Sequence, residues 1–203
     1  FLISRGCHPQ KIFVVPNPVD INLFREMNLG PREGIVFLGN VTPDKNIGTI
    51  LKALTIIKKK YPTIKLHIYG EKEFNTLVES LNLKENIILH GFVPHQNLPK
   101  KLNRHLIFVN SSISEGQCLA VFESALCGLA LCLPKTLSFE GVFKDKALFH
   151  EIYNYQKLAE NIKMYLENEP FRIHNVKLCQ RMIKENYNYE KILNDFAQLI
   201  KSF

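Results

Sequence analysis

The sequence predicts an α/β fold in which a parallel sheet is covered by helices on both faces, a doubly wound arrangement. Continuous apolar runs, typical of strands buried on both faces, alternate with amphipathic segments of helical period, and three of the runs end in glycine (Gly39, Gly70 and Gly91). Short links join these segments, so the strands run parallel, with a helix at each crossover. With 203 residues, 46% of them hydrophobic and 22% charged, the chain has the composition of a globular domain with a sizeable core.

Local patterns place the individual elements. Residues 35–39 (IVFLG) are a continuous apolar run, and residues 47–57 carry isoleucine and leucine at helical spacing after Asp44 or Asn46, either of which can cap the helix. Residues 11–16 (KIFVVP) predict a short strand that stops at proline. The other expected strands cover residues 64–70, 86–91, 105–110 and 129–133, and the other expected helices cover residues 74–81, 96–102, 118–127, 156–166, 171–185 and 189–201.

The composition argues against several classes of protein. No apolar stretch approaches the roughly 18 residues of a membrane-spanning helix. The five cysteines include no Cys-x-x-Cys pair and the seven histidines lack metal-ligand spacing, so we expect no disulfide framework and no metal, and a reducing compartment fits. The net charge of +7 is spread out, without an arginine-rich stripe, so we expect no binding of nucleic acid. Because the chain begins with Phe1 and no leader follows, we expect a piece of a longer protein.

The segment of residues 106–134 carries the most informative charges. Among its 29 residues only Glu115 and Glu123 are charged. Glu123 lies within LAVFESALCG, which otherwise predicts a buried helix that ends at Gly128. A buried carboxylate without a partner is costly, so Glu123 must reach solvent, accept from a protein donor, or accept from a ligand hydroxyl such as that of a sugar or ribose. We favour the ligand.

Glu115 lies at an expected strand-to-helix turn, on the edge of the sheet where open α/β folds bind ligands. Gly116, Gln117 and Cys118 lead into the first helical turn, where free N–H groups and the positive helix end favour an anion such as phosphate. Because Lys45 also follows a strand, we expect it within reach of Glu115, at the mouth of a cleft. The alternative is that Glu115 is merely solvated and Glu123 bonds to backbone groups in the core.

Several motifs, in the right order, resemble glycosyltransferase family 4. SEGQCLAVFESALCGLALCLP resembles the Glu-x7-Glu region of that family, VPNPVD its Pro-Asn-Gly-Val-Asp turn, and FLGNVTPDKN its region with Gly-Arg followed by lysine. LHIYG and LHGFV resemble the next two strand ends, and FEGVFKDKALF resembles the segment after the glutamate pair. Together these motifs cover nearly all of the chain. The resemblance implies a Rossmann-like sheet with C-terminal helices, the C-terminal half of a B-type (GT-B) glycosyltransferase.

The same resemblance implies a division of the chain. Residues 1–30 would be the tail of a missing N-terminal acceptor domain plus a linker. Residues 31–184 would form the domain that binds the nucleotide sugar, and residues 185–203 a helix that returns toward the missing domain.

The resemblance also assigns roles to single residues. Lys45 matches the lysine that holds the donor diphosphate, Glu115 the carboxylate that contacts the transferred sugar, and Glu123 the carboxylate on the ribose. Lys45 and Glu115 would therefore be the catalytic pair. Gly116, Gln117, Cys118 and Leu119 match the loop that holds the phosphate and the sugar, and Phe92 and Val93 match the positions at the base. Gly39 and Asn40 complete the implied donor-binding positions, and Asn40 stands where the family has an arginine.

The implied reaction transfers a hexose, with retention, from a nucleotide diphosphate sugar such as a UDP- or GDP-hexose to an acceptor hydroxyl. Lys45 and the helix N-terminus would stabilise the leaving diphosphate. We expect no metal or other cofactor, because the chain has no Asp-x-Asp motif. Basic members of the family often work at the inner membrane face, so we expect a cytoplasmic protein whose charge permits peripheral contact with a membrane.

Other interpretations of the same sequence compete with this one. A nicotinamide-dependent domain needs Gly-x-Gly-x-x-Gly after the first strand, and GNVTPDKNIG lacks that spacing. A sugar-nucleotide epimerase of the same fold is an alternative enzyme, and Asn40 together with the absent partner domain also fits a non-catalytic binding or scaffold module. Titration with nucleotides separates the scaffold from the enzymes, and product analysis separates transferase from epimerase.

Overall fold

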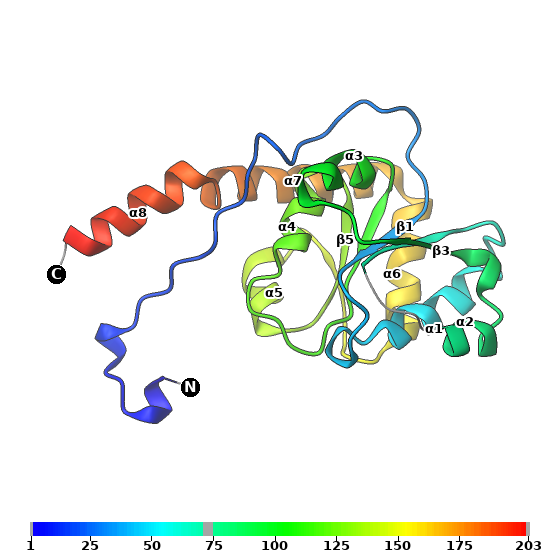
Figure 1. The fold of residues 1–203 in the computed structure, drawn as a ribbon, viewed down its shortest axis with the longest axis horizontal. Helices are drawn as coiled ribbons and strands as arrows, with labels where there is room; N and C mark the ends of the chain where they lie inside the picture. The colour runs from blue at the N-terminus through cyan, green and yellow to red at the C-terminus, as the bar shows by residue number, and fades with distance from the viewer. Residues whose placement is uncertain (1, 71–74, 202–203) are drawn as a thin grey trace.

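The computed structural model of the chain describes residues 2–70 and 75–201 (Figure 1). Within these residues, a six-stranded sheet has the strand order β3-β2-β1-β4-β5-β6. The strands are β1 (Ile35–Leu38), β2 (Leu66–Tyr69), β3 (Ile87–Gly91), β4 (Ile107–Val109), β5 (Ala130–Pro134) and β6 (Leu148–His150). Every neighbouring pair is parallel; Ile35 of β1, for example, lies opposite Leu66 of β2 and Ile107 of β4. The predicted doubly wound parallel sheet is confirmed.

Helices cover both faces of the sheet (Figure 1). They are α1 (Ile47–Ile57), α2 (Asn75–Ser80), α3 (Leu98–Leu102), α4 (Leu119–Leu126), α5 (Leu137–Phe143), α6 (Tyr155–Glu167), α7 (Glu169–Asn186) and α8 (Tyr189–Lys201). On β1, Ile35 and Phe37 belong to the core that α1 and α6 close, while Val36 belongs to the core under α4. Because strand side chains alternate between faces, an unbroken apolar run such as IVF supplies both cores at once.

The structure corrects the prediction in two places. Residues 11–16 form no strand: the side chains of Val14 and Val15 are 89% and 44% exposed, and no described residue pairs with this segment in a sheet. An apolar pattern makes a strand only where a neighbour satisfies its N–H and C=O groups. Conversely, α5 and β6 lie where we predicted no element, because Gly141 and the charges of residues 144–146 break both periodicities. Residue 74 of the predicted helix 74–81 falls outside the described residues.

Both ends of the chain leave the domain at one place. The N–H of Val19 donates to Tyr187 O at 2.7 Å, and Val19 also pairs with Asn188 in an isolated bridge. From here residues 2–18 and α8 both extend away from the sheet, on the same side of the molecule (Figure 1). Val19 and Phe24 are buried in the core, so the C-terminal part of the segment 1–30 packs against the domain.

Candidate functional site

The strand order places the junction between two oppositely wound halves of the sheet at β1 and β4. From β1 the sheet continues outward through β2 to β3, and from β4 it continues the other way through β5 to β6. At such a junction the loops after the two strands diverge and leave a crevice outside their carboxyl ends. The loop after β1 contains the short 3-10 helix η3 (Pro43–Lys45), and the loop after β4 carries Glu115 toward α4. The fold therefore brings Lys45 and Glu115 to the same carboxyl edge of the sheet.

Lys45 and Glu115 form an ion pair there. Lys45 Nζ lies 2.6 Å from Glu115 Oε1, to which Ser112 Oγ also donates at 2.8 Å. The two charged side chains are 27% and 12% exposed. Burial by itself lowers the pKa of Lys45, but the hydrogen bond and charge of Glu115 outweigh it and raise that pKa above its ordinary value. The carboxyl edge thus carries a charged ammonium with further N–H donors that could bind an anionic ligand.

Hydrogen bonds to main-chain oxygens hold the two loops against each other. Ser111 Oγ lies 2.8 Å from both Lys45 O and Asn46 O, and the N–H of Ile113 donates to Asp44 O at 2.8 Å. Asn46 occupies the N-cap of α1 with φ 49°, yet its side chain does not cap the helix, and its buried Nδ2 has no partner among the described residues. The distance between Lys45 and Glu115 is therefore set by main-chain geometry as well as by the ion pair.

Glu123 is held by a protein side chain. It is 6% exposed within α4, and its Oε1 accepts from His95 Nε2 at 2.7 Å. His95 begins the 3-10 helix η5 (His95–Asn97), and its side chain is 61% exposed. Of the partners that the sequence left open for Glu123, the structure shows a protein donor. Sequence reasoning missed His95 because it lies 28 residues away and a lone histidine in a polar loop carries no pattern.

A cavity of about 320 Å³, whose lining includes His95 but not Glu123, lies at the carboxyl ends of β1, β2 and β3. It is lined by Leu38, Gly39, Asn40, Tyr69, Gly70, Phe92, Val93, His95 and Leu98. Four predicted positions, Gly39, Asn40, Phe92 and Val93, therefore meet in one place. Gly70 has φ 154°, and a Cβ there would overlap Gly39 O, so the close approach of the two strand ends requires glycine.

The loop of residues 116–118 is tied to the N-terminal segment. The N–H of Asn17 donates to Gln117 Oε1 at 2.6 Å, and Gln117 Nε2 donates back to Asn17 O at 2.8 Å. Gly116 and Cys118 line a cavity of about 410 Å³ with Val15, Phe122 and Tyr187, among others. Sequence reasoning placed Gln117 at the loop but not its partner, since 100 residues separate the two and nothing in the local pattern connects them.

The N-terminus of α4 adjoins this loop. The helix begins at Leu119, and Cys118 at the N-cap makes no side-chain bond to the first turn. Burial raises the pKa of the Cys118 thiol to about 11, so the thiol is neutral near pH 7. The first-turn N–H groups and the helix dipole are therefore not neutralised by an anionic cap.

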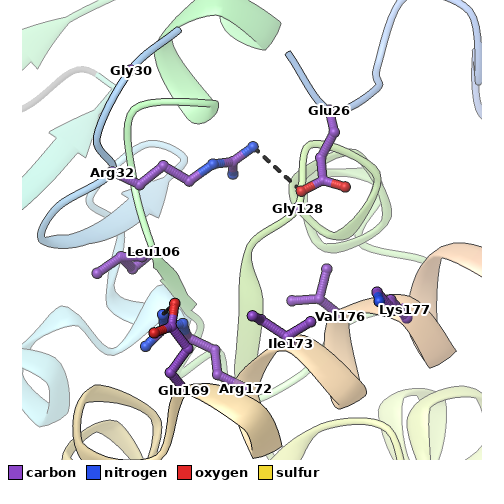
Figure 2. Close-up of a pocket in the computed structure, with 10 residues that line it drawn as sticks. All are labelled: Glu26, Gly30, Arg32, Leu106, Gly128, Glu169, Arg172, Ile173, Val176 and Lys177. Carbon is purple, nitrogen blue, oxygen red and sulfur yellow. Dashed lines mark hydrogen bonds and ion pairs between the residues drawn. The ribbon is translucent and has the colours of Figure 1, made fainter. Parts of the chain in front are cut away.

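A further cavity, of about 430 Å³, lies at the opposite edge of the sheet, where β4 and β5 begin. Figure 2 shows its lining, which includes Arg32 and Arg172 with the acidic Glu26 and Glu169. Both arginines are engaged by backbone oxygens: Arg32 Nη1 donates to Cys127 O at 2.7 Å and Arg172 Nη1 to Tyr165 O at 2.8 Å. The predicted site residues, all of which the structure describes, lie elsewhere. We therefore place the candidate site at the carboxyl edge.

Within residues 2–70 and 75–201, no three or more His, Cys, Asp or Glu side chains are arranged to hold a metal ion. Among the helices that the structure describes, none is long and apolar enough to cross a membrane. That donor binding needs no metal stays a prediction.

The sheet and its flanking helices define a Rossmann-like α/β domain with charged side-chain pairs at its carboxyl edge. Residues 22–189, most of the chain, match the family described as Glycosyl transferases group 1. The chain therefore belongs to this family and contains its glycosyltransferase domain.

Individual relatives are consistent with that assignment. Over 145 residues the chain is 28% identical to D-inositol 3-phosphate glycosyltransferase of Segniliparus rotundus, covering 63% of this chain and 32% of the relative. It is 25% identical over 203 residues to poly(ribitol-phosphate) alpha-N-acetylglucosaminyltransferase of Staphylococcus aureus, covering 94% and 41%. The fold matches a crystal structure of Anabaena Alr3699/HepE in complex with UDP with a TM-score of 0.89 at 16% identity, covering 99% and 60%. The chain thus spans well under half the length of these two curated relatives.

Proposed function

We propose that the chain is the C-terminal, donor-binding half of a retaining family 4 glycosyltransferase, which moves a hexose from a UDP-hexose to an acceptor hydroxyl. The observation that carries this proposal is the Lys45–Glu115 pair, 2.6 Å apart at the junction of β1 and β4. A cation and a carboxylate at one ligand crevice suit a donor with a charged diphosphate next to a sugar with hydroxyl groups.

The diphosphate would be bound by Lys45 and by the first turn of α4. As the bond from the sugar to the diphosphate breaks, negative charge grows on the leaving phosphate oxygen, and a fixed ammonium and helix N-terminus stabilise that charge. Glu115 would accept from sugar hydroxyls and so orient the hexose. Since these groups supply the positive charge, no step in the proposal uses a metal. A base for the acceptor hydroxyl would come from the remainder of the protein or from the leaving phosphate.

The nucleoside would lie over the cavity next to Glu123. The carboxylate is suited to the ribose hydroxyls, and Phe92, which is 72% exposed, offers a ring face to the base. We favour uridine because structures similar in fold were crystallised with UDP or UDP-glucose, although at 16% identity the likeness itself shows only the fold. GDP remains the alternative nucleotide.

The acceptor would be bound by a part of the protein that lies outside this chain. Both curated relatives described above are much longer than the matched region. Residues 13–15 and α8 extend from the domain with large apolar side chains exposed, including Leu193 and Ile200 at 60% and 58%. These surfaces would pack against the N-terminal acceptor domain, so we expect the isolated chain to bind donor but to transfer little or no sugar.

Isothermal titration of the chain with UDP, GDP and ADP in EDTA tests the proposal. We expect UDP to bind without metal and more tightly than the purine nucleotides. Failure of all three to bind would overturn the proposed function. Loss of binding in EDTA that magnesium or manganese restores would overturn its metal-free part. Retention is tested separately, by the anomeric configuration of the product made by the longer protein.

A further inference from the structure

His95 lines the cavity of about 320 Å³ at the carboxyl ends of β1, β2 and β3, over which we propose that the nucleoside lies. Its ring packs at a tilt on Phe24, with the ring centroids 4.9 Å apart, and Phe24 itself is fully buried. Its Nε2 lies 2.7 Å from Glu123 Oε1, and the histidine lines the cavity together with Phe92 and Val93. The ring is therefore held on one face and at one nitrogen, while most of the side chain stays open to solvent.

The hydrogen bond defines which groups remain available. An ionised carboxylate only accepts, so the proton between the two groups is on His95 Nε2. Glu123 Oε1 keeps a second lone pair, and no hydrogen bond from a described residue reaches Oε2. His95 thus fixes one oxygen of a buried carboxylate and leaves the other for a ligand hydroxyl.

We propose that His95 is a positioning residue for nucleoside binding, which orients the Glu123 carboxylate toward the ribose of the donor. The inference rests on the proposed function, since it assumes that Glu123 contacts ribose. A glutamate on a helix has three side-chain torsions, and a donor that selects one arrangement removes the entropic cost of ordering it when the ligand arrives. The same donor stabilises the charge of a carboxylate that is only 6% exposed.

A purely structural role for His95 makes a different prediction. If the histidine only packs on Phe24, its removal would lower the stability of the domain and leave ligand affinity unchanged. If it orients Glu123, its removal would weaken every ligand that carries ribose, and would leave inorganic pyrophosphate, which needs only Lys45 and the first turn of α4, unaffected.

The test measures the affinities of UDP and of pyrophosphate by titration calorimetry on the whole chain. The first variant, His95→Ala, removes the donor, and the second, His95→Gln, keeps an N–H donor of similar reach. His174→Ala is the control, because His174 is an exposed histidine on α7. We expect His95→Ala to weaken UDP binding by about tenfold, equivalent to about 1.4 kcal/mol. We expect His95→Gln to recover most of that loss, and pyrophosphate affinity and the His174→Ala control to stay within about twofold of the wild type.

Comparison with Glu123→Gln tells whether His95 acts through the carboxylate. If it does, the double variant His95→Ala, Glu123→Gln should bind UDP about as weakly as Glu123→Gln alone. If the fold-losses in UDP affinity of the two single variants simply multiply in the double variant, the inference is overturned. Unchanged UDP affinity in His95→Ala would overturn it too. If His95→Ala does not fold, unchanged UDP affinity in a folded His95→Phe variant has the same meaning. If the wild-type chain binds UDP no more tightly than pyrophosphate, this inference alone is overturned. If the wild-type chain binds neither ligand, the proposed function is overturned as well.

Discussion

The two edges of the sheet each hold charged side chains beside a cavity, but they use those charges differently. At the carboxyl edge, Lys45 bonds to Glu115 and His95 bonds to Glu123, so side chains are paired with side chains. At the amino edge, Arg32 donates to the backbone oxygen of Cys127 as well as to Asn103 Oδ1, so a charged side chain there is also bonded to the backbone. Arg172 likewise donates to Tyr165 O as well as to Glu169 Oε1.

This difference is the reason why we propose the carboxyl edge, and not the amino edge, as the ligand site. Two side chains that pair with each other can turn toward a ligand, and the main chain loses none of its hydrogen bonds when they do. A guanidinium that satisfies a buried carbonyl cannot move without leaving that oxygen unpaired, which costs about 1–3 kcal/mol. The cavity at the amino edge is the larger of the two, at about 430 Å³ against about 320 Å³, yet its two arginines are committed to the fold.

The largest expected effect is the loss of UDP affinity in Lys45→Met. Removing the ammonium takes away a charge-assisted bond to the diphosphate and leaves Glu115 to repel it, so we expect a loss of about 100-fold, or about 3 kcal/mol. Lys59→Met, an exposed lysine after α1, changes the net charge equally and is the control. Calorimetry that found equal affinities for both variants would remove Lys45 from the site.

The next effect is on the ribose contact. Glu123→Gln keeps the shape and one acceptor oxygen, so we expect weaker UDP binding by about 1–3 kcal/mol with a nearly unchanged melting temperature. A lower melting temperature with unchanged affinity would instead make Glu123 a carboxylate of the core, bonded to His95 for structural reasons only.

Arg32→Met tests the amino edge. Cys127 O and Asn103 Oδ1 each lose a donor that lies at 2.7 Å, so we expect the free energy of unfolding in urea to fall by about 2 kcal/mol. UDP affinity should stay unchanged. Arg181→Met, an exposed arginine on α7, is the matched control and should leave both quantities alone. An Arg32 variant that folds normally but binds UDP poorly would contradict the distinction between the two edges.

A smaller effect is expected on the pH dependence of stability, from His67 on β2, His90 on β3 and His105 just before β4. His67 Nδ1 lies 2.9 Å from His90 Nε2, and Tyr69 Oη lies 3.0 Å from His105 Nε2. Burial lowers the pKa of His67 and of His90, and lowers the pKa of His105 to about 3. The charged groups that also act on the cluster are Arg32, Glu33, Lys65 and Lys101.

The sign of the resulting pH dependence follows from His105. Its pKa is near 6.5 in an unfolded chain and about 3 in the fold, so below pH 6.5 the unfolded chain binds more protons. The stability is therefore fully present above pH 6.5 and is lost as the pH falls toward 3. We expect the free energy of unfolding to drop by about 1–1.5 kcal/mol between pH 7.5 and 5.5 from His105 alone. Urea titrations of His105→Gln, which does not titrate, should show a smaller drop; an equal drop would assign it to other groups.

Much of the fold was predictable because its signals are local. The apolar run of β1 and the helical spacing in α1 each lie within about a dozen residues, and the structure confirms a strand and a helix there. The approach of Lys45 to Glu115 was also predictable, since parallel strands carry their following loops to the same edge.

What could not be predicted depends on contacts between distant residues. The donor to Glu123 comes from His95 in a different loop, and Gln117 is bonded to Asn17 across 100 positions of sequence. The apolar segment 11–16 failed as a predicted strand for the same reason, because a strand is defined by a neighbour that the local pattern does not contain. The short helix α5 was not predicted because Gly141 interrupts its helical pattern. The burial of Phe139 and Phe143 in the core stabilises this helix.

Amide hydrogen exchange of the chain with and without UDP tests the central claim most directly, because it reports on both edges in one measurement. We predict that UDP slows exchange in residues 39–46, 92–95 and 111–123, around the carboxyl edge. Residues 26–32 and 169–177, which border the cavity in Figure 2, should exchange at unchanged rates. Protection at the amino edge with none in the loops of Lys45 and Glu115 would contradict the account.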